Sequence, residues 1–218
     1  MGTTVLGLCV TGTLSEMEVL RSQYSLGSYK VRIHTLPTTR QGASVEDDLQ
    51  TKVVGIGQDV LVELHLVKGI NESLSQQNDT NMFVTLFVGV LDLQTFTLDY
   101  CNAGHDSPAM IADGEVTMLP CDSNIPAGVM SGWEFTRQQT QMTAGSTIFL
   151  YTDGLNEAED SSHRQFGMTR VVETAKTTEN TPQQLIDSMT EAVRQFVGQA
   201  EQSDDLTMLA IKVTNKNA

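Results

Sequence analysis

Two short acidic motifs stand beside apolar runs that are typical of buried strands. Asp153-Gly154 follows the run at 146–152, and Asp204-Asp205 precedes the run at 206–213. A carboxylate at the mouth of a buried strand costs free energy unless it is paired or binds a metal. Mg²⁺ and Mn²⁺ prefer hard oxygen ligands, usually one or two carboxylates with several waters. Two such motifs about fifty residues apart therefore predict a shared divalent metal site.

The candidate metal ligands are Asp153, Gly154, Asp204 and Asp205, and the two aspartates that begin the motifs, Asp153 and Asp204, are also the candidate catalytic residues. Two divalent ions can turn water into a nucleophile while they neutralise a phosphate. Gly154 would let the backbone turn sharply away from the strand end. Each motif also has a structural interpretation, because Asp-Gly is often only a turn and Asp-Asp is often a solvated corner. The pattern alone leaves both interpretations open.

Two helices are predicted around these strands. Apolar residues recur at helical spacing between Val60 and Leu74, which indicates a helix that packs on the core. The shared face consists of Val60, Leu64, Val67, Ile70 and Leu74. Farther along, Thr181 is a suitable N-cap, Pro182 suits the first helical position and Gly198 suits the end of a second helix.

The middle of the chain predicts strands. Apolar runs at 82–90 and 96–101 indicate a hairpin, and shorter runs at 109–111 and 115–119 extend it into an antiparallel meander. The less regular residues 1–50 contain pieces, such as 29–34, that suit one or two strands. Strands that come in runs, with helices grouped elsewhere, predict an α+β fold with helices packed on antiparallel sheet.

The composition fits one domain over residues 1–218, since 39% of the residues are hydrophobic. A net charge of −14 with only 13 scattered Lys and Arg argues against nucleic acid or an anionic membrane as partner. The three cysteines, Cys9, Cys101 and Cys121, show neither a disulfide nor a zinc pattern, which fits a cytoplasmic location. We expect neither a secretory leader nor a membrane span, because no basic segment precedes the first apolar run and no long apolar stretch occurs.

Three strings of residues resemble a known family. They are FLYTDGLNEA at 149–158, YCNAGH at 100–105 and SDDLTM at 203–208, with Phe166-Gly167 in the expected order. Together they resemble the metal-dependent (PPM-type, protein phosphatase 2C-like) serine/threonine phosphatases. More narrowly, they resemble the bacterial branch that contains stage II sporulation protein E and the phosphatases that regulate sigma factors. The resemblance runs from about residue 66 to residue 213, whereas residues 1–65 are expected to be an atypical or truncated form of the family's N-terminal part.

The resemblance implies a β-sandwich flanked by helices, with two Mn²⁺ or Mg²⁺ ions bridged by the attacking water. Asp153 matches the aspartate of the family's Thr-Asp-Gly ligand, and Asp204 matches the first acid of its second ligand motif, with Asp205 as its neighbour. His105 matches the family's Ala-Gly-His turn. Its alternative role is a histidine that only packs and caps the turn.

The implied function is that of an Mn²⁺- or Mg²⁺-dependent enzyme in signal transduction. It would hydrolyse phosphoserine or phosphothreonine on a bacterial signalling protein, such as a phosphorylated anti-sigma factor antagonist. A metal-binding hydrolase of another phosphate ester is a further interpretation.

The chain departs from the family upstream of the first helix. The family's Gly-Gly-Asp and Gly-Asp-Val-Ser-Gly motifs, which complete the metal cage, do not occur in residues 1–65. The acidic cluster at 46–48 and Asp59 are substitutes, although both also suit the charged start of a helix. The alternative function is therefore a catalytically impaired pseudophosphatase that acts as a regulatory, protein-binding module.

Overall fold

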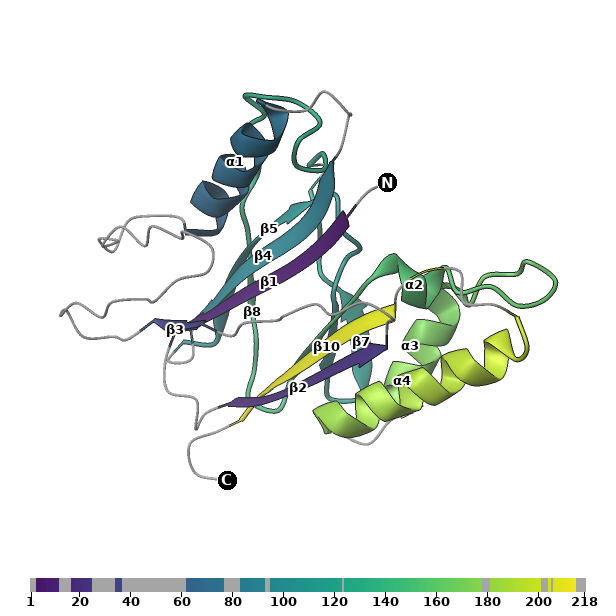
Figure 1. Cartoon of the computed structure of the whole chain (residues 1–218). Helices are drawn as coiled ribbons and strands as arrows, with labels where there is room; N and C mark the ends of the chain where they lie inside the picture. The colour runs from purple at the N-terminus through teal and green to yellow at the C-terminus, as the bar shows by residue number, and fades with distance from the viewer. Residues whose placement is uncertain are drawn as a thin grey trace.

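The computed structural model describes most of the chain. It covers residues 3–11, 17–24, 34–36, 62–76, 83–92, 95–122, 124–177, 181–200, 204 and 206–214, the first three ranges through their backbone. These residues form two five-stranded sheets stacked face to face, with helices on both outer faces (Figure 1). The predicted α+β class with a β-sandwich flanked by helices is confirmed.

The first sheet has the strand order β3-β1-β4-β5-β8. Its strands are β1 (Thr3–Thr11), β3 (His34–Leu36), β4 (Val84–Asp92), β5 (Thr97–Ala103) and β8 (Gln138–Gln141). The β4–β5 hairpin matches the prediction, and its two strands pair antiparallel. In contrast to a fully antiparallel sandwich, β1 pairs parallel with both β3 and β4. Of the predicted strand at 29–34, only His34 lies within the described residues.

The second sheet has the order β2-β10-β9-β6-β7 and is antiparallel throughout. Its strands are β2 (Met17–Tyr24), β6 (Ala109–Ala112), β7 (Glu115–Met118), β9 (Thr147–Tyr151) and β10 (Leu206–Val213). The predicted four-strand meander is therefore wrong, because β5 and β6 lie in different sheets. The connection at 104–108 turns on Gly104, whose φ is 72°, and carries the chain from one sheet to the other.

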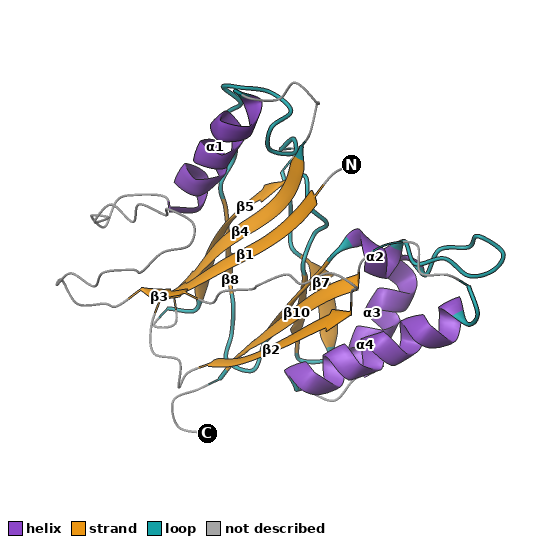
Figure 2. Ribbon diagram, viewed as in Figure 1, coloured by secondary structure: helices purple, strands orange, loops and turns teal. Residues whose placement is uncertain are grey.

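Alternate side chains of β9 pack on opposite faces of the second sheet. In β9, Ile148 and Leu150 contact the first sheet, whereas Phe149 and Tyr151 contact the helices on the outer face. All four side chains are at most 2% exposed. Successive residues of a strand point to opposite faces, so a strand buried on both sides is apolar throughout. Figure 2 shows this layering of helix, sheet, sheet and helix.

Helix α1 (Val62–Ser75) covers the outer face of the first sheet (Figure 2). Val67 is fully buried there, and Leu64 and Leu74 pack beside it, as predicted. Ile70 is 37% exposed, so its prediction as a core residue is wrong. The buried neighbour is Asn71, whose amide accepts from Gly128 N and donates to the Met130 carbonyl, each over 2.9 Å. The predicted first residue, Val60, lies outside the described residues.

Helices α3 (Gly167–Thr177) and α4 (Pro182–Val197) cover the second sheet, and the short helix α2 (Asp153–Asn156) directly follows β9. The prediction for α4 is confirmed at both ends. Thr181 Oγ1 accepts from Gln184 N over 3.2 Å, Pro182 is the first residue of the helix and Gly198 caps its end.

Loss of the Thr181 cap should destabilise the protein measurably. We expect Thr181→Ala to lower the free energy of unfolding by about 1 kcal/mol, because one N-terminal N–H of α4 loses its acceptor. Urea unfolding would measure the change. Thr169→Ala, at an exposed position inside α3, is the matched control and should change stability by less than about 0.5 kcal/mol. Equal losses in the two variants would contradict the capping role.

Two further features of the structure concern membrane spans and cysteines. Within the described residues, no helix is both long and apolar enough to cross a membrane. Cys101 and Cys121 are free thiols, while the side chain of Cys9 is not described.

Candidate active site

Asp153 and Asp204 lie at the same end of two neighbouring strands. Tyr151, the last residue of β9, pairs with Met208 of β10. One step farther, Thr152 N donates to the Thr207 carbonyl and Thr207 N donates to Thr152 Oγ1, each over 3.0 Å. Asp153 follows the end of β9, and Asp204 precedes the start of β10. Because these two strands are antiparallel neighbours, both aspartates lie at the same end of the sheet. In Figure 1, α2 accordingly lies beside the start of β10.

The surroundings of these residues differ from the expectation in two respects. The side chains of Asp153 and Asp204 are exposed, so folding did not bury either carboxylate and the predicted desolvation cost is wrong. Gly154 does not make a sharp turn, because it is a buried residue of α2 and has no positive φ. Asp205 lies outside the described residues, as do the acidic cluster at 46–48 and Asp59.

Asp106 is a third carboxylate near this end of the sheet, and it was not predicted from the sequence. Residues 104–108 approach the site because β6 pairs with β9, and Tyr151 Oη donates to the Ser107 carbonyl over 3.2 Å. Burial raises the pKa of Asp106; the nearby His105 opposes this rise and the Asp153 carboxylate adds to it. No motif signals this residue, since its position depends on a pairing between strands far apart in the sequence.

Asn156 connects Asp106 to α2. With its amide nitrogen turned toward these groups, it donates to Asp106 Oδ2 over 3.1 Å and to the Asp153 carbonyl over 3.3 Å. The side chain therefore links the 104–108 connection to the first turn after β9. It was not predicted either.

His105 is buried beside these carboxylates, with 8% of its surface exposed. Burial lowers the pKa of its imidazole, against the opposing effects of the Asp106 carbonyl and of the Asp106 and Asp153 charges. Its Nδ1 lies 2.8 Å from the Asp106 carbonyl oxygen, and Nε2 has no hydrogen-bond partner among the described residues. An unpaired buried polar atom costs about 1–3 kcal/mol, so this one requires a reason.

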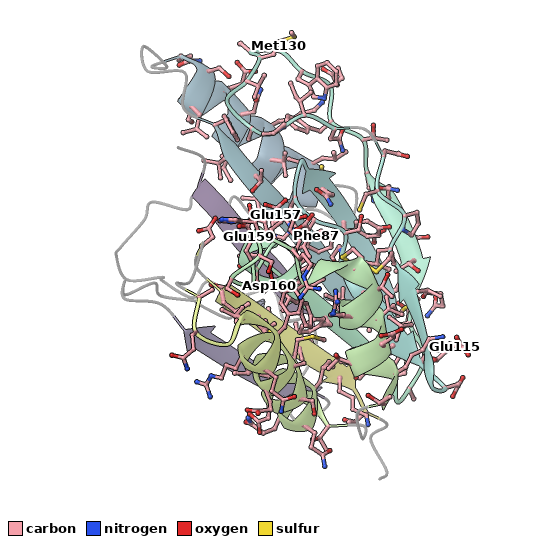
Figure 3. All side chains as sticks on the ribbon, turned by 90° about the vertical axis from the view of Figure 1, so that its right-hand side faces the viewer. Phe87, Glu115, Met130, Glu157, Glu159 and Asp160 are labelled. Carbon is pink, nitrogen blue, oxygen red and sulfur yellow. The ribbon has the colours of Figure 1, made fainter. Side chains whose placement is uncertain are left out.

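The segment after α2 is stabilised by its own ion pair. Glu157, Glu159 and Asp160 lie together there (Figure 3). Asp160 Oδ2 accepts from Arg164 Nε over 2.8 Å, and this bond is the main reason that the pKa of Asp160 falls to about 2. The segment then rejoins the core at Phe166, which is 1% exposed.

The donor set suits a hard divalent cation but does not complete its shell. Asp153 and Asp204 offer carboxylate oxygens, which Mg²⁺ and Mn²⁺ prefer. Within the ranges that the structure describes, however, no three His, Cys, Asp or Glu side chains are grouped closely enough to hold an ion. The described residues therefore fit part of a metal site, with waters and residues outside these ranges left to supply the rest.

Comparison with known proteins identifies the family. The family model for stage II sporulation protein E (SpoIIE) matches residues 58–214, which is most of the chain. The chain belongs to the SpoIIE family. This family consists of PP2C-type phosphatases, so the resemblance found in the sequence is confirmed.

The curated relatives of this SpoIIE-family chain are much longer proteins. Protein IcfG of Synechocystis sp. is 31% identical over 150 residues, which cover 68% of this chain and 24% of that protein. Stage II sporulation protein E of Bacillus subtilis is 28% identical over 149 residues, which cover 67% of this chain and 17% of that protein. The matched part thus spans about a quarter or less of each.

Solved structures show the same fold. The PP2C phosphatase domain of the cell fate determinant SpoIIE from Bacillus subtilis, solved with a fragment of its regulatory domain, gives a TM-score of 0.59 at 24% identity, covering 70% of this chain and 45% of that one. The phosphatase domain of the same protein, presoaked with Mn, gives 0.57 at 21% identity, covering 95% and 88%. At these identities, the likeness establishes the PP2C fold.

The turn that carries His105 should not tolerate a side chain at Gly104. A Cβ there would lie 2.7 Å from Pro126 Cγ and 2.9 Å from Pro126 N, at a φ of 72°. We expect Gly104→Ala to cost more than the roughly 1–2 kcal/mol of a left-handed residue, because Pro126 must also move. Thermal or urea unfolding would measure this cost.

Gly114→Ala is the matched control for that variant. Gly114 has a φ of 76°, yet nothing lies within 4 Å of its added Cβ. In this SpoIIE-family chain, Gly114→Ala should therefore lower the free energy of unfolding only by the cost of a left-handed alanine, roughly 1–2 kcal/mol. Equal destabilisation at the two positions would show that Pro126 does not constrain the His105 turn.

Proposed function

We propose that this chain is a metal-dependent protein serine/threonine phosphatase acting on a bacterial signalling protein. The observation that carries the proposal is the pair of hydrogen bonds between Thr152 and Thr207. In a SpoIIE-family chain, these bonds hold Asp153 and Asp204 at the shared end of β9 and β10. Side chains that are presented by adjacent strands keep their relative position without a large conformational change.

Asp153 and Asp204 are the proposed catalytic residues, and both would hold Mn²⁺ or Mg²⁺ through carboxylate oxygens. Asp205 is a further proposed ligand, together with Gly154, which can offer only its backbone carbonyl. When bound, such ions lower the pKa of a coordinated water and neutralise charge on the phosphate. The chain's own part is to position the carboxylates. Because water would be the nucleophile, hydrolysis would need no covalent intermediate on the protein.

The proposed substrate is a phosphorylated anti-sigma factor antagonist or a similar cytoplasmic signalling protein. This choice is supported by a further relative, the phosphoserine phosphatase RsbU of Bacillus subtilis, which is 22% identical over 93 residues. That match covers 42% of this chain and 28% of RsbU. Phosphoserine as the residue that this chain dephosphorylates is therefore a proposal.

A regulatory module without activity is the second candidate. It is favoured by the lack of a three-ligand group among the described residues and by the absence of the family's upstream acidic motifs from residues 1–65. Such a chain would keep the sandwich and bind a partner protein without hydrolysing phosphate.

Hydrolysis of p-nitrophenyl phosphate and of a phosphoserine peptide, with and without millimolar Mn²⁺, distinguishes the two candidates. We expect Mn²⁺-dependent release of phosphate from both substrates. A folded protein that releases none at any Mn²⁺ concentration would refute the enzyme and favour the regulatory module. Hydrolysis of the small ester alone would indicate another phosphate ester as substrate.

A further inference from the structure

The backbone of His105 is held by one buried side chain. Asn102, which is 2% exposed, accepts from His105 N through Oδ1 and donates to the His105 carbonyl through Nδ2, each over 2.7 Å. Its own carbonyl accepts from Asn124 Nδ2 over 3.0 Å. The position of the His105 backbone therefore does not depend on the imidazole ring, and the ring is available for another role.

The tautomer of the ring follows from its one hydrogen bond. Nδ1 lies 2.8 Å from the Asp106 carbonyl oxygen, and a carbonyl can only accept. Nδ1 of the neutral ring must therefore carry the proton, which leaves the lone pair on Nε2. Nε2 is buried and unpartnered among the described residues, so a strong acceptor is held at a fixed place without a donor.

The charged groups that act on this ring belong to the proposed active site. They are the carboxylates of Asp106 and Asp153, and Asn156 joins the two segments that carry them. Of the two carboxylates, Asp153 is a proposed metal ligand, and Asn156 ties the 104–108 connection, which carries His105, to the Asp153 carbonyl over 3.3 Å. A hydrated cation at Asp153 would bring water to this connection, where the unpartnered Nε2 can accept a hydrogen bond. Metal-ligating histidines commonly fix their tautomer through a backbone carbonyl on the other nitrogen. His105 has the same kind of Nδ1 bond, although it is not a proposed ligand.

We propose that His105 is a positioning residue of the phosphatase site, whose unprotonated Nε2 accepts a hydrogen bond from a water molecule at the Asp153 carboxylate. This inference rests on the proposed function. His105 orients the water while Nδ1–H stays on the Asp106 carbonyl, and no proton is transferred to the ring. The alternative is that the ring only fills space beneath the turn.

Two substitutions separate the nitrogens. In His105→Asn, the amide can replace Nδ1 as a donor to the Asp106 carbonyl, but nothing replaces Nε2. In His105→Gln, the longer side chain can bring its amide oxygen to the place of Nε2. We expect the Asn variant to remain folded with kcat lowered about 10–100-fold and KM unchanged, and the Gln variant to recover part of kcat. An Asn variant with the kcat of the unmodified chain would overturn the proposal.

Nitrogen NMR of the His105 ring gives a readout that does not depend on activity. With Mg²⁺ as the probe, we expect Nε2 to be unprotonated. Its resonance should shift as Mg²⁺ is added to the unmodified chain, and it should not shift when Mg²⁺ is added to Asp153→Asn. A protonated Nε2, or one that ignores Mg²⁺ while calorimetry shows Mg²⁺ binding, would overturn the role of His105 alone. Absence of any Mg²⁺ or Mn²⁺ binding would instead remove the proposed function, and this inference with it.

Discussion

Asp153→Asn should abolish most of the metal-dependent phosphatase activity and leave the fold intact. Loss of a residue that only supports a metal ligand costs about 10–100-fold, so loss of a ligand should cost more than about 100-fold in kcat/KM. The fold should survive because the Asp153 side chain is exposed, and the one hydrogen bond described for it is the local one from Gly154 N over 3.1 Å. Phosphate release with Mn²⁺, together with urea unfolding, would measure both effects.

Asp113→Asn is the matched control for this variant. Asp113 is also exposed, but it lies in the turn between β6 and β7, where its φ is 51°, a conformation that asparagine adopts readily. The substitution removes the same charge away from the site and should leave kcat/KM unchanged. Unfolding of Asp153→Asn, or full activity in it, would refute the role assigned to this carboxylate.

Phe149→Ala should be the most destabilising of the substitutions considered. Phe149 is fully buried in the central strand β9 and packs with Tyr151 against the helices on the outer face, at a ring distance of 5.5 Å. Truncating a buried phenylalanine costs about 3–5 kcal/mol through lost burial and the cavity left behind. That is a large part of the 5–15 kcal/mol typical of a domain. Urea unfolding would measure the loss.

Phe83→Ala makes the same chemical change at an exposed position. Phe83 precedes β4 and is 38% exposed, so its truncation should lower the free energy of unfolding by less than about 1 kcal/mol. A loss below about 1 kcal/mol at Phe149 as well would contradict the assignment of β9 to the middle of the sandwich.

The elements that could be predicted are those whose signals are local. The α4 helix carries its boundaries in its own residues, since Thr181, Pro182 and Gly198 each satisfy a requirement of a helix end. β9 and β10 could be recognised because a strand buried on both faces is apolar throughout. The division of strands between two sheets has no local signal. The sequence therefore predicted one meander through 109–111, whereas the connection at 104–108 carries the chain from one sheet to the other.

The same distinction holds for the site. Asp153 and Asp204 could be found because each borders an apolar run. Asp106 could not, because it reaches the site only through the pairing of β6 with β9. The buried state expected for the carboxylates was wrong for a physical reason: both follow or precede the strands at the rim of the sandwich, where side chains remain exposed.

Calorimetric titration of Mn²⁺ into the unmodified chain, Asp153→Asn and Asp204→Asn tests most directly whether these two carboxylates share a metal site. We predict that the unmodified chain binds Mn²⁺ and that each substitution weakens binding by more than about 10-fold, with Asp113→Asn unchanged. Equal Mn²⁺ affinity in all four proteins, or no binding by the unmodified chain, would contradict a metal site at the shared end of β9 and β10.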